Sequence, residues 1–248
     1  MIFAIIGLTD DLLGWKHGGL SAKFRVFLAL IASIPLVVIN AGVQEVWAPF
    51  IGAVSLGLIY PLVILPLAVA GAATTYNFLA GFNGLEAGQG IIIIGFLSFI
   101  SYATGSLWLA LVGGIMVSCL VVFYIYNKFP AKVFPGDSLT YTIGALIAIM
   151  AILGNFERIA LFVFIPYFIE SGLKVRGKLK KQSFGVPDKD GNLKLPYEKF
   201  YGLTHVSIGI LSKLKKQVHE RDVVFIIFIF QILICIAALF IFRGVLFI

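Results

Sequence analysis

The chain has 248 residues, of which 60% are hydrophobic and only 12% are charged, and its mean hydropathy is +1.03. This composition is typical of an integral membrane protein and excludes an ordinary soluble domain. The formal charge of +7 could indicate a nucleic-acid partner, but the basic residues are confined to particular loops. An anionic membrane surface explains them better, and we expect no nucleic acid. Cys119 and Cys235 lie in apolar runs, so we expect neither a disulfide framework nor a zinc site.

Apolar stretches along the chain predict an all-α, polytopic membrane helix bundle. Residues 1–8 are apolar but too short to cross a bilayer, and they have no basic region or cleavage site of a signal peptide. We interpret them as the end of an earlier helix, so that the chain is an N-terminally truncated fragment that could be inactive. Several later stretches fall short of the roughly 20 residues of a straight span. We expect seven complete spans, at 26–43, 59–73, 90–103, 107–126, 138–153, 159–169 and 223–242.

The distribution of basic residues predicts the orientation of these spans. We treat 1–248 as a single membrane domain, with 172–221 as a 50-residue cytoplasmic loop before the last span. With alternating spans, 17 of the 19 Lys and Arg residues then face the cytoplasm, as the positive-inside tendency predicts. The same topology predicts a cytoplasmic active site, because it places six polar side chains on that face: Asp10, Asp11, Asn77, Asn83, Glu86 and Asp137.

Two adjacent carboxylates, Asp10 and Asp11, follow the first apolar segment. They repel each other and would gain from a bound cation. The alternative is a solvated helix end beside Lys16.

The segment 77–89 (NFLAGFNGLEAGQ) combines three amides, a carboxylate and three glycines directly after an apolar run. Such polar groups at a membrane boundary are costly unless they bind something, and glycines allow a ligand to approach the backbone closely. The alternative is a structural cap followed by a tight turn, because Asn and Gly are common at helix C-termini.

The segment 133–138 (VFPGDS) places Asp137 where a helix N-cap is expected, so capping alone is one interpretation. The other is metal binding. Mg²⁺ prefers one or two carboxylates together with phosphate oxygens and water, which a sparse set of side chains from three loops can provide.

The segment 77–89 resembles the signature of the UDP-N-acetylglucosamine:dolichyl-phosphate N-acetylglucosamine-1-phosphotransferases, in the polyprenyl-phosphate sugar-1-phosphate transferase superfamily. Its NGLEAGQ part resembles the eukaryotic and archaeal branch, and GLTDD at 7–11, GLSA at 19–22 and VFPGD at 133–137 agree with it. The absence of long inserts favours an archaeal source. The resemblance implies transfer of GlcNAc-1-phosphate from UDP-GlcNAc to a dolichyl or other polyprenyl phosphate, the first membrane step of lipid-linked oligosaccharide assembly for N-glycosylation.

The resemblance also implies roles for individual residues. Asn77 and Asp137 match the magnesium ligands of the family, with Mn²⁺ as an alternative metal, and Asp10 and Asp11 match its catalytic aspartate pair. The remaining candidates are substrate-binding: Arg25, Gly81, Asn83, Glu86 and Phe134, of which Gly81, Asn83 and Phe134 match the uridine contacts of the family. Arg25 falls where relatives usually carry a lysine, so the cation is kept but its geometry changes.

The 172–221 loop departs from the family. In relatives, the corresponding loop carries a sugar-recognition motif that is rich in His and Arg. The nearest stretch, KLKKQSF at 178–184, has no histidine. Lys180 and Lys181 are candidate donor-phosphate ligands, or a basic strip near anionic lipid. Residues 187–192 predict a turn between short extended pieces, and we do not expect His205 or His219 to be catalytic.

Three other functions stay open from the sequence: a bacterial-type undecaprenyl-phosphate transferase, a secondary transporter and a non-catalytic scaffold. A transporter should show repeated halves, and the chain has no internal repeat. The partners we expect are the two substrates and membrane lipids, with a homodimer left open. The membrane is the cell membrane in an archaeon and the endoplasmic reticulum in a eukaryote.

Overall fold

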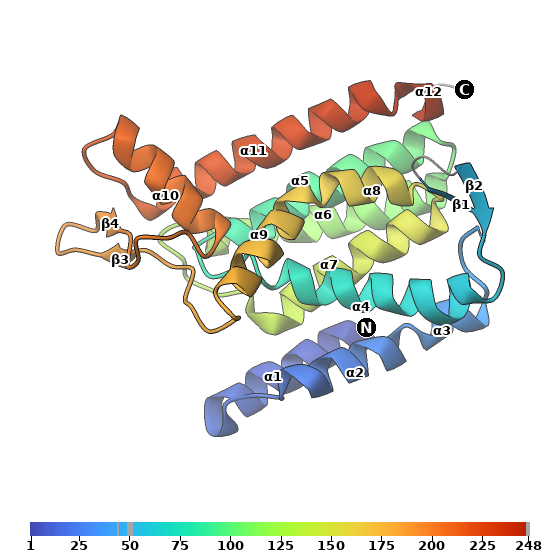
Figure 1. Cartoon of the computed structure of the whole chain (residues 1–248), viewed down its shortest axis with the longest axis horizontal. Helices are drawn as coiled ribbons and strands as arrows, with labels where there is room; N and C mark the ends of the chain where they lie inside the picture. Colours follow the sequence, from blue (N-terminus) through green and yellow to red (C-terminus); the bar gives the residue numbers. More distant parts are fainter. Residues whose placement is uncertain (44, 49–51, 247–248) are drawn as a thin grey trace.

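The computed structural model describes residues 1–43, 45–48 and 52–246, and most of this chain is helical (Figure 1). A five-residue π-helix, η1 (Tyr60–Ile64), runs directly into α4. The α-helices are α1 (Ile2–His17), α2 (Ala22–Ala32), α3 (Ile34–Val38), α4 (Leu65–Tyr76), α5 (Leu85–Ala103), α6 (Leu107–Asn127), α7 (Gly136–Leu153), α8 (Glu157–Val163), α9 (Ile165–Arg176), α10 (Leu203–Leu214), α11 (Glu220–Ile241) and α12 (Arg243–Leu246).

Within the described residues, four helices are long and apolar enough to cross a membrane: α5, α6, α7 and α11. The other three expected spans appear as shorter or interrupted helices. Ser33 separates α2 from α3, Phe164 separates α8 from α9, and each break stands directly before an Ile-Pro pair. Proline lacks the amide proton that a continuous helix needs. The prediction of a helical membrane protein is confirmed, and the count of seven spans stays a prediction.

Two small antiparallel sheets correct the expectation of an all-α fold. β1 (Glu45–Ala48) pairs with β2 (Gly52–Ser55), a hairpin that the sequence analysis did not predict. β3 (Val186–Pro187) pairs with β4 (Leu193–Lys194), which confirms the predicted turn at 187–192. The Asp188 carboxylate stabilises this turn by accepting hydrogen bonds from the backbone amides of Asp190 and Asn192.

Helix α7 packs against both α1 and α4, and glycines make these contacts close. A Cβ atom on Gly7 would lie 2.4 Å from the backbone oxygen of Asp137, and one on Gly144 would lie 2.5 Å from that of Ala72. Small residues allow membrane helices to approach in this way. As a result, the first turn of α7 lies against α1.

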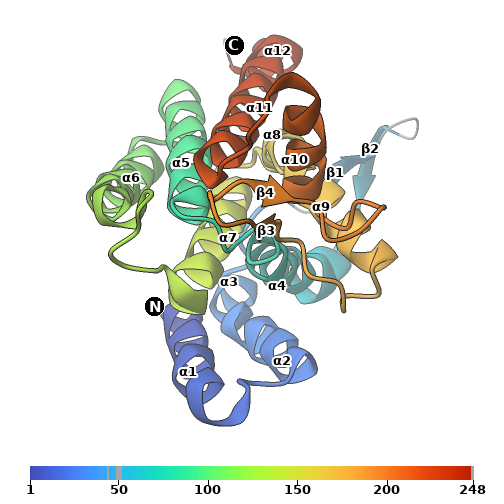
Figure 2. The ribbon, with the colours of Figure 1, turned by 90° about the vertical axis from the view of Figure 1, so that its left-hand side faces the viewer.

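The elements are distributed unevenly between the two ends of the bundle. The β3–β4 sheet and α10 lie at one end, whereas β1, β2 and the C-terminus lie at the other (Figure 1). Viewed from the first end, α1 and α2 form a pair on one side of the bundle, away from α11 (Figure 2).

Candidate active site

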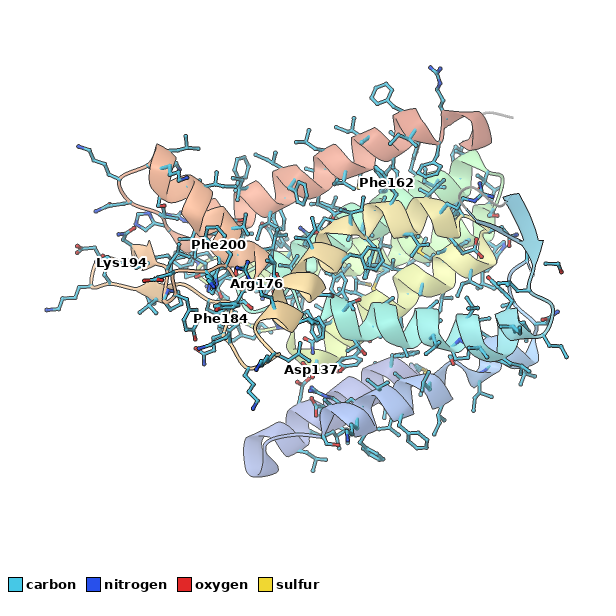
Figure 3. The ribbon with its side chains drawn as sticks, in the orientation of Figure 1. Asp137, Phe162, Arg176, Phe184, Lys194 and Phe200 are labelled. Carbon is cyan, nitrogen blue, oxygen red and sulfur yellow. The ribbon has the colours of Figure 1, made fainter. Side chains whose placement is uncertain are left out.

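Five of the predicted site residues come together where α1, α2, α4 and α7 meet. We call them the carboxylate cluster: Asp10, Asp11, Arg25, Asn77 and Asp137. In Figure 3, Asp137 lies near the middle of the long axis, and Arg176 and Phe184 lie farther toward the end that carries Lys194.

Arg25 connects two carboxylates of this cluster. Its Nη1 atom lies 2.8 Å from Asp10 Oδ2 and 3.1 Å from Asp137 Oδ2. Asp10 is only 7% exposed and also accepts a hydrogen bond from the backbone amide of Leu20 at 2.5 Å. The interpretation of Asp10 as a solvated helix end is therefore wrong, since α1 continues to His17 and the side chain is buried.

Asn77 connects α4 to α7. It occupies the C-cap position of α4, as expected for an amide after an apolar run, and its Nδ2 donates to Asp137 Oδ1 at 3.0 Å. Asp137 is not the N-cap of α7, because the helix begins at Gly136 and its cap position is Pro135. With one oxygen bonded to Asn77 and the other to Arg25, the Asp137 carboxylate is engaged with side chains from two other elements.

The capping of α7 is carried out instead by Asp11 of α1. Its two carboxylate oxygens accept hydrogen bonds from the backbone amides of Asp137, at 2.9 Å, and Ser138, at 3.1 Å. A negative charge at a helix N-terminus is stabilised by the free amides and the helix dipole. Gly136 has a φ of +61°, and a Cβ there would lie 2.5 Å from Asp11 Oδ2, so a side chain at this position would displace the cap.

The segment 77–84, which we call the signature loop, forms a second set of contacts between α4 and α5. The Gly81 amide donates to Glu86 Oε1 at 2.6 Å, and Glu86 is 4% exposed. Gly81 has a φ of +105°, and a Cβ there would lie 2.4 Å from the Phe184 ring. Glycine is therefore required at this point, and Phe184 covers the loop.

Asn83 of the signature loop is bound to Glu220 at the start of α11. Its backbone amide donates to Glu220 Oε1, and its side-chain Nδ2 donates to Glu220 Oε2 at 3.4 Å. Glu220 was not among the predicted residues. The only local sign of a role for Glu220 is its place as a carboxylate in the first turn of the last long apolar helix. Nothing in the sequence near Glu220 connects it to Asn83.

An ion pair between half-buried Lys174 and buried Glu170 holds the signature loop from the side of α9. Lys174 Nζ donates to the backbone oxygen of Phe78 at 2.5 Å and lies 3.7 Å from Glu170 Oε1. The other oxygen of Glu170 accepts the amide of Leu203, at the start of α10, at 2.5 Å. Burial lowers the pKa of Lys174 below its usual 10.5, an effect that the adjacent Glu170 opposes.

His205 is held by backbone groups, and its absence from catalysis stays a prediction. It is fully buried, its Nδ1 accepts the amide of Tyr201 at 3.3 Å, and its Nε2 lies 3.1 Å from the backbone oxygen of Phe184. Since a carbonyl can only accept, Nε2 carries the proton and the ring is neutral. Burial lowers the pKa of His205 below its usual 6.5, and the Phe184 carbonyl partly opposes this.

Three predicted residues lie apart from these contacts. Phe134 is 73% exposed in the segment before α7. Lys180 is exposed, and Lys181 Nζ lies 4.8 Å from the centroid of the Tyr197 ring, within the 172–221 segment. Among the described contacts, none joins Lys180 or Lys181 to the carboxylate cluster.

A largely apolar cavity of about 640 Å³ extends along α4, α7 and α8. Its lining on α4 runs from Leu65 to Thr75, a stretch of about 15 Å of helix. Thr75 stands two residues before Asn77. The far end of the cavity contains Tyr60, whose hydroxyl donates to Glu157 Oε1 at 2.8 Å. On α4 the cavity therefore ends two residues before Asn77 of the carboxylate cluster, whereas on α7 its lining starts at Ile147, ten residues after Asp137.

Comparison with known proteins defines the class to which this fold and site belong. The model of glycosyl transferase family 4 matches residues 1–155, and the chain belongs to that family. The predicted resemblance is thereby confirmed.

The more similar relatives are archaeal. A protein of Saccharolobus solfataricus, provisionally named UDP-N-acetylglucosamine--dolichyl-phosphate N-acetylglucosaminephosphotransferase, is 37% identical over 83% of this chain and 63% of its own length. A protein of Sulfolobus acidocaldarius with the same provisional name is 36% identical over 96% of this chain and 70% of its own length. The transferase of that name in Dictyostelium discoideum is 30% identical over 66% of this chain and 47% of its own length. The predicted eukaryotic and archaeal branch is confirmed.

Proposed function

We propose that the chain transfers GlcNAc-1-phosphate from UDP-GlcNAc to a dolichyl or other polyprenyl phosphate, giving a polyprenyl-diphospho-GlcNAc and UMP. The observation that carries this proposal is the position of the carboxylate cluster at the end of α4 along which the apolar cavity runs. A polyprenyl phosphate requires both a charged site for its head and an apolar path for its tail. Membership of glycosyl transferase family 4 and the names of the relatives support the same reaction.

In this reaction an oxygen of the lipid phosphate bonds to the β-phosphorus of UDP-GlcNAc. The bond from that phosphorus to the oxygen bridging the two phosphates breaks, and UMP leaves. Both reactants are anions, so a fixed cation between them lowers the cost of their approach and stabilises the charge that moves to UMP. Arg25 is the cation of the carboxylate cluster, and Asp10 holds its guanidinium in place.

Asp10 and Asp11 act by positioning in this account. The second pKa of a phosphate monoester is about 6, so the lipid phosphate is mostly ionised at neutral pH and needs little help from a base. Asp11 fixes the first turn of α7, and with it Asp137, relative to α1. Accurate placement of reacting groups can supply a large part of a rate enhancement.

Mg²⁺, with Mn²⁺ as the alternative, is the metal we propose. The described residues contain no group of three or more His, Cys, Asp or Glu side chains that could hold a metal by themselves. Asn77 and Asp137 nevertheless supply suitable ligand types for a magnesium ion, an amide oxygen and a carboxylate side by side, with phosphate and water as the other ligands. The Asn77 amide, which donates Nδ2 to Asp137 in the structure, would turn its Oδ1 toward the ion. When bound, the ion would supply positive charge at the phosphates.

We further propose the topology expected from the sequence, with seven spans and the carboxylate cluster on the cytoplasmic side. The cluster, the signature loop and the basic 172–221 segment meet through α9 and α10, which supports a common side for them. Chemical labelling of single cysteines placed in the 172–221 segment, in a variant that lacks Cys119 and Cys235 and in sealed inverted vesicles, tests this orientation.

The proposed reaction is tested by incubating membranes that contain the chain with radiolabelled UDP-GlcNAc or, in parallel, radiolabelled UDP-MurNAc-pentapeptide, each with a series of lipid phosphates. We expect labelled lipid with dolichyl or other long polyprenyl phosphates. A strong preference for UDP-MurNAc-pentapeptide and undecaprenyl phosphate would assign the bacterial-type reaction instead. Absence of transfer by the folded chain would contradict the proposed reaction and favour the non-catalytic scaffold that the sequence left open.

A further inference from the structure

The contact between Asn83 and Glu220 has a chemical consequence for nucleotide selection. It joins the signature loop to α11 across 137 positions of the sequence. Asn83 is half-buried, so part of its side chain remains accessible. The inference below rests on the proposed function and on Asn83 as the uridine contact that the family resemblance implies.

The carboxylate of Glu220 determines which way the Asn83 amide faces. An ionised carboxylate can only accept hydrogen bonds, whereas a side-chain amide has an NH₂ donor on one side and a carbonyl acceptor on the other. Turning the amide over would place its oxygen against Glu220 Oε2, where two acceptors repel. The backbone amide of Asn83 is bound to the other oxygen of Glu220, so the backbone of the residue stays beside the carboxylate and the repulsion disfavours the turned-over amide.

With the amide fixed, Oδ1 faces away from Glu220 and one N–H of Nδ2 remains available. No described residue donates a hydrogen bond to this Oδ1 in the structure. The imide edge of uracil presents an N–H donor next to a carbonyl acceptor, which matches an amide in this fixed orientation. Cytosine presents the reverse pattern, with an acceptor nitrogen next to an amino group, and would require the amide to turn over.

We propose that Glu220 is a positioning residue that gives the site its preference for uridine over cytidine nucleotides, by holding the Asn83 amide in one orientation. Glu220 does not touch the nucleotide in this account. A site that is built for one hydrogen-bond pattern rejects the reversed pattern because buried polar groups are then left unpaired.

The test is binding of UMP and of CMP to the purified 248-residue chain in detergent micelles, measured by calorimetry. Wild-type protein should prefer UMP. In Glu220→Gln the side chain can either accept or donate, so the Asn83 amide is no longer held in one orientation. We expect the Kd of UMP to rise about tenfold and the preference for UMP over CMP to fall by a similar factor. Glu220→Asp keeps an acceptor-only group and should retain part of the preference. In turnover, KM for UDP-GlcNAc should rise in Glu220→Gln with kcat nearly unchanged.

Two further variants separate positioning from folding. Asp222→Asn alters the same helical turn but not the contact with Asn83, and its UMP preference should equal that of the wild type. Asn83→Ala should lose the preference, and adding Glu220→Gln to it should have little further effect. An unchanged preference in folded Glu220→Gln, together with a loss in Asn83→Ala, would overturn the role of Glu220. If the wild type itself shows no preference for UMP, the proposed uridine donor fails as well.

Discussion

Arg25 Nη1 lies 3.1 Å from Asp137 Oδ2, which joins α2 to the first turn of α7 across 112 positions of the sequence. The same nitrogen lies 2.8 Å from Asp10 Oδ2, so a single guanidinium separates two carboxylates that would otherwise repel each other. The arrangement ties α1, α2 and α7 together at the point where we propose that the phosphates bind.

Removing this charge should affect both stability and transfer. Arg25→Met leaves Asp10 and Asp137 without their cation, and we expect it to cost about 2 kcal/mol of unfolding free energy and most of the activity. Arg25→Lys keeps a positive charge but not the planar group, so it should retain more of both. Thermal unfolding and transfer assays in detergent measure the two effects. Equal activity in Arg25→Met and the wild type would contradict the proposed role.

Asp11 should contribute mainly through the cap it forms on α7. Asp11→Ala removes both acceptors, and we expect a loss of about 1–2 kcal/mol. Asp11→Asn keeps one oxygen acceptor and should lose less stability. Its turnover should be slower without a change in the pH optimum, because the acceptor phosphate is already ionised. Thr9→Ala, an exposed substitution on the same helix, is the control. A shift of the acidic limb of the pH–rate profile in Asp11→Asn would indicate general-base catalysis instead.

Acid should destabilise the 172–221 segment through His205. Its pKa is lowered in the folded protein from the usual 6.5, so the unfolded chain binds more protons below that pH. Stability therefore changes little above about pH 7 and decreases as the pH falls through about 6.5 toward the lower pKa of the folded state. His205→Gln should weaken this acid destabilisation, measured by thermal unfolding at pH 7.5 and pH 5.5. His219→Gln, which replaces a partly exposed imidazole, should keep it, and equal slopes for wild type and His205→Gln would exclude His205 as the cause.

The role of Lys181 can be decided by salt. A donor-phosphate ligand in a closed site is screened weakly, whereas attraction to a lipid surface is worth about 1 kcal/mol per charge and is screened within a Debye length of about 8 Å. We expect Lys181→Ala to raise the KM for UDP-GlcNAc at both low and high salt. Lys180→Ala, one residue earlier, is the matched comparison. A difference from the wild type at low salt alone would assign Lys181 to the membrane surface.

The elements that the sequence predicted well are those whose signal is local. The 107–126 stretch agrees with α6 within one residue because a long, uninterrupted apolar run leaves little choice of boundary. The convergence of Asp10, Asn77 and Asp137 was predicted because each stands near a helix end on one side of the expected topology.

The contacts that the sequence did not predict join residues that are far apart in the chain. Asp11 caps α7 from another helix, and Glu220 and Lys174 bind the signature loop from α11 and α9. Capping rules describe a residue within its own helix, so they assigned the cap of α7 to Asp137. The interruption of the 159–169 span at Phe164 was missed because its apolar composition continues through Pro166.

The fate of the β-phosphate of UDP-GlcNAc tests the central claim most directly, because it distinguishes transfer of a sugar phosphate from transfer of a sugar. Membranes containing the chain are incubated with UDP-GlcNAc labelled with ³²P at the β-position and with a polyprenyl phosphate. The proposed reaction moves the label into the lipid and releases UMP, and Asp137→Ala, folded to the same extent, should do neither. Label that remains in the aqueous phase as UDP while GlcNAc enters the lipid, or equal transfer by wild type and Asp137→Ala, would contradict the account.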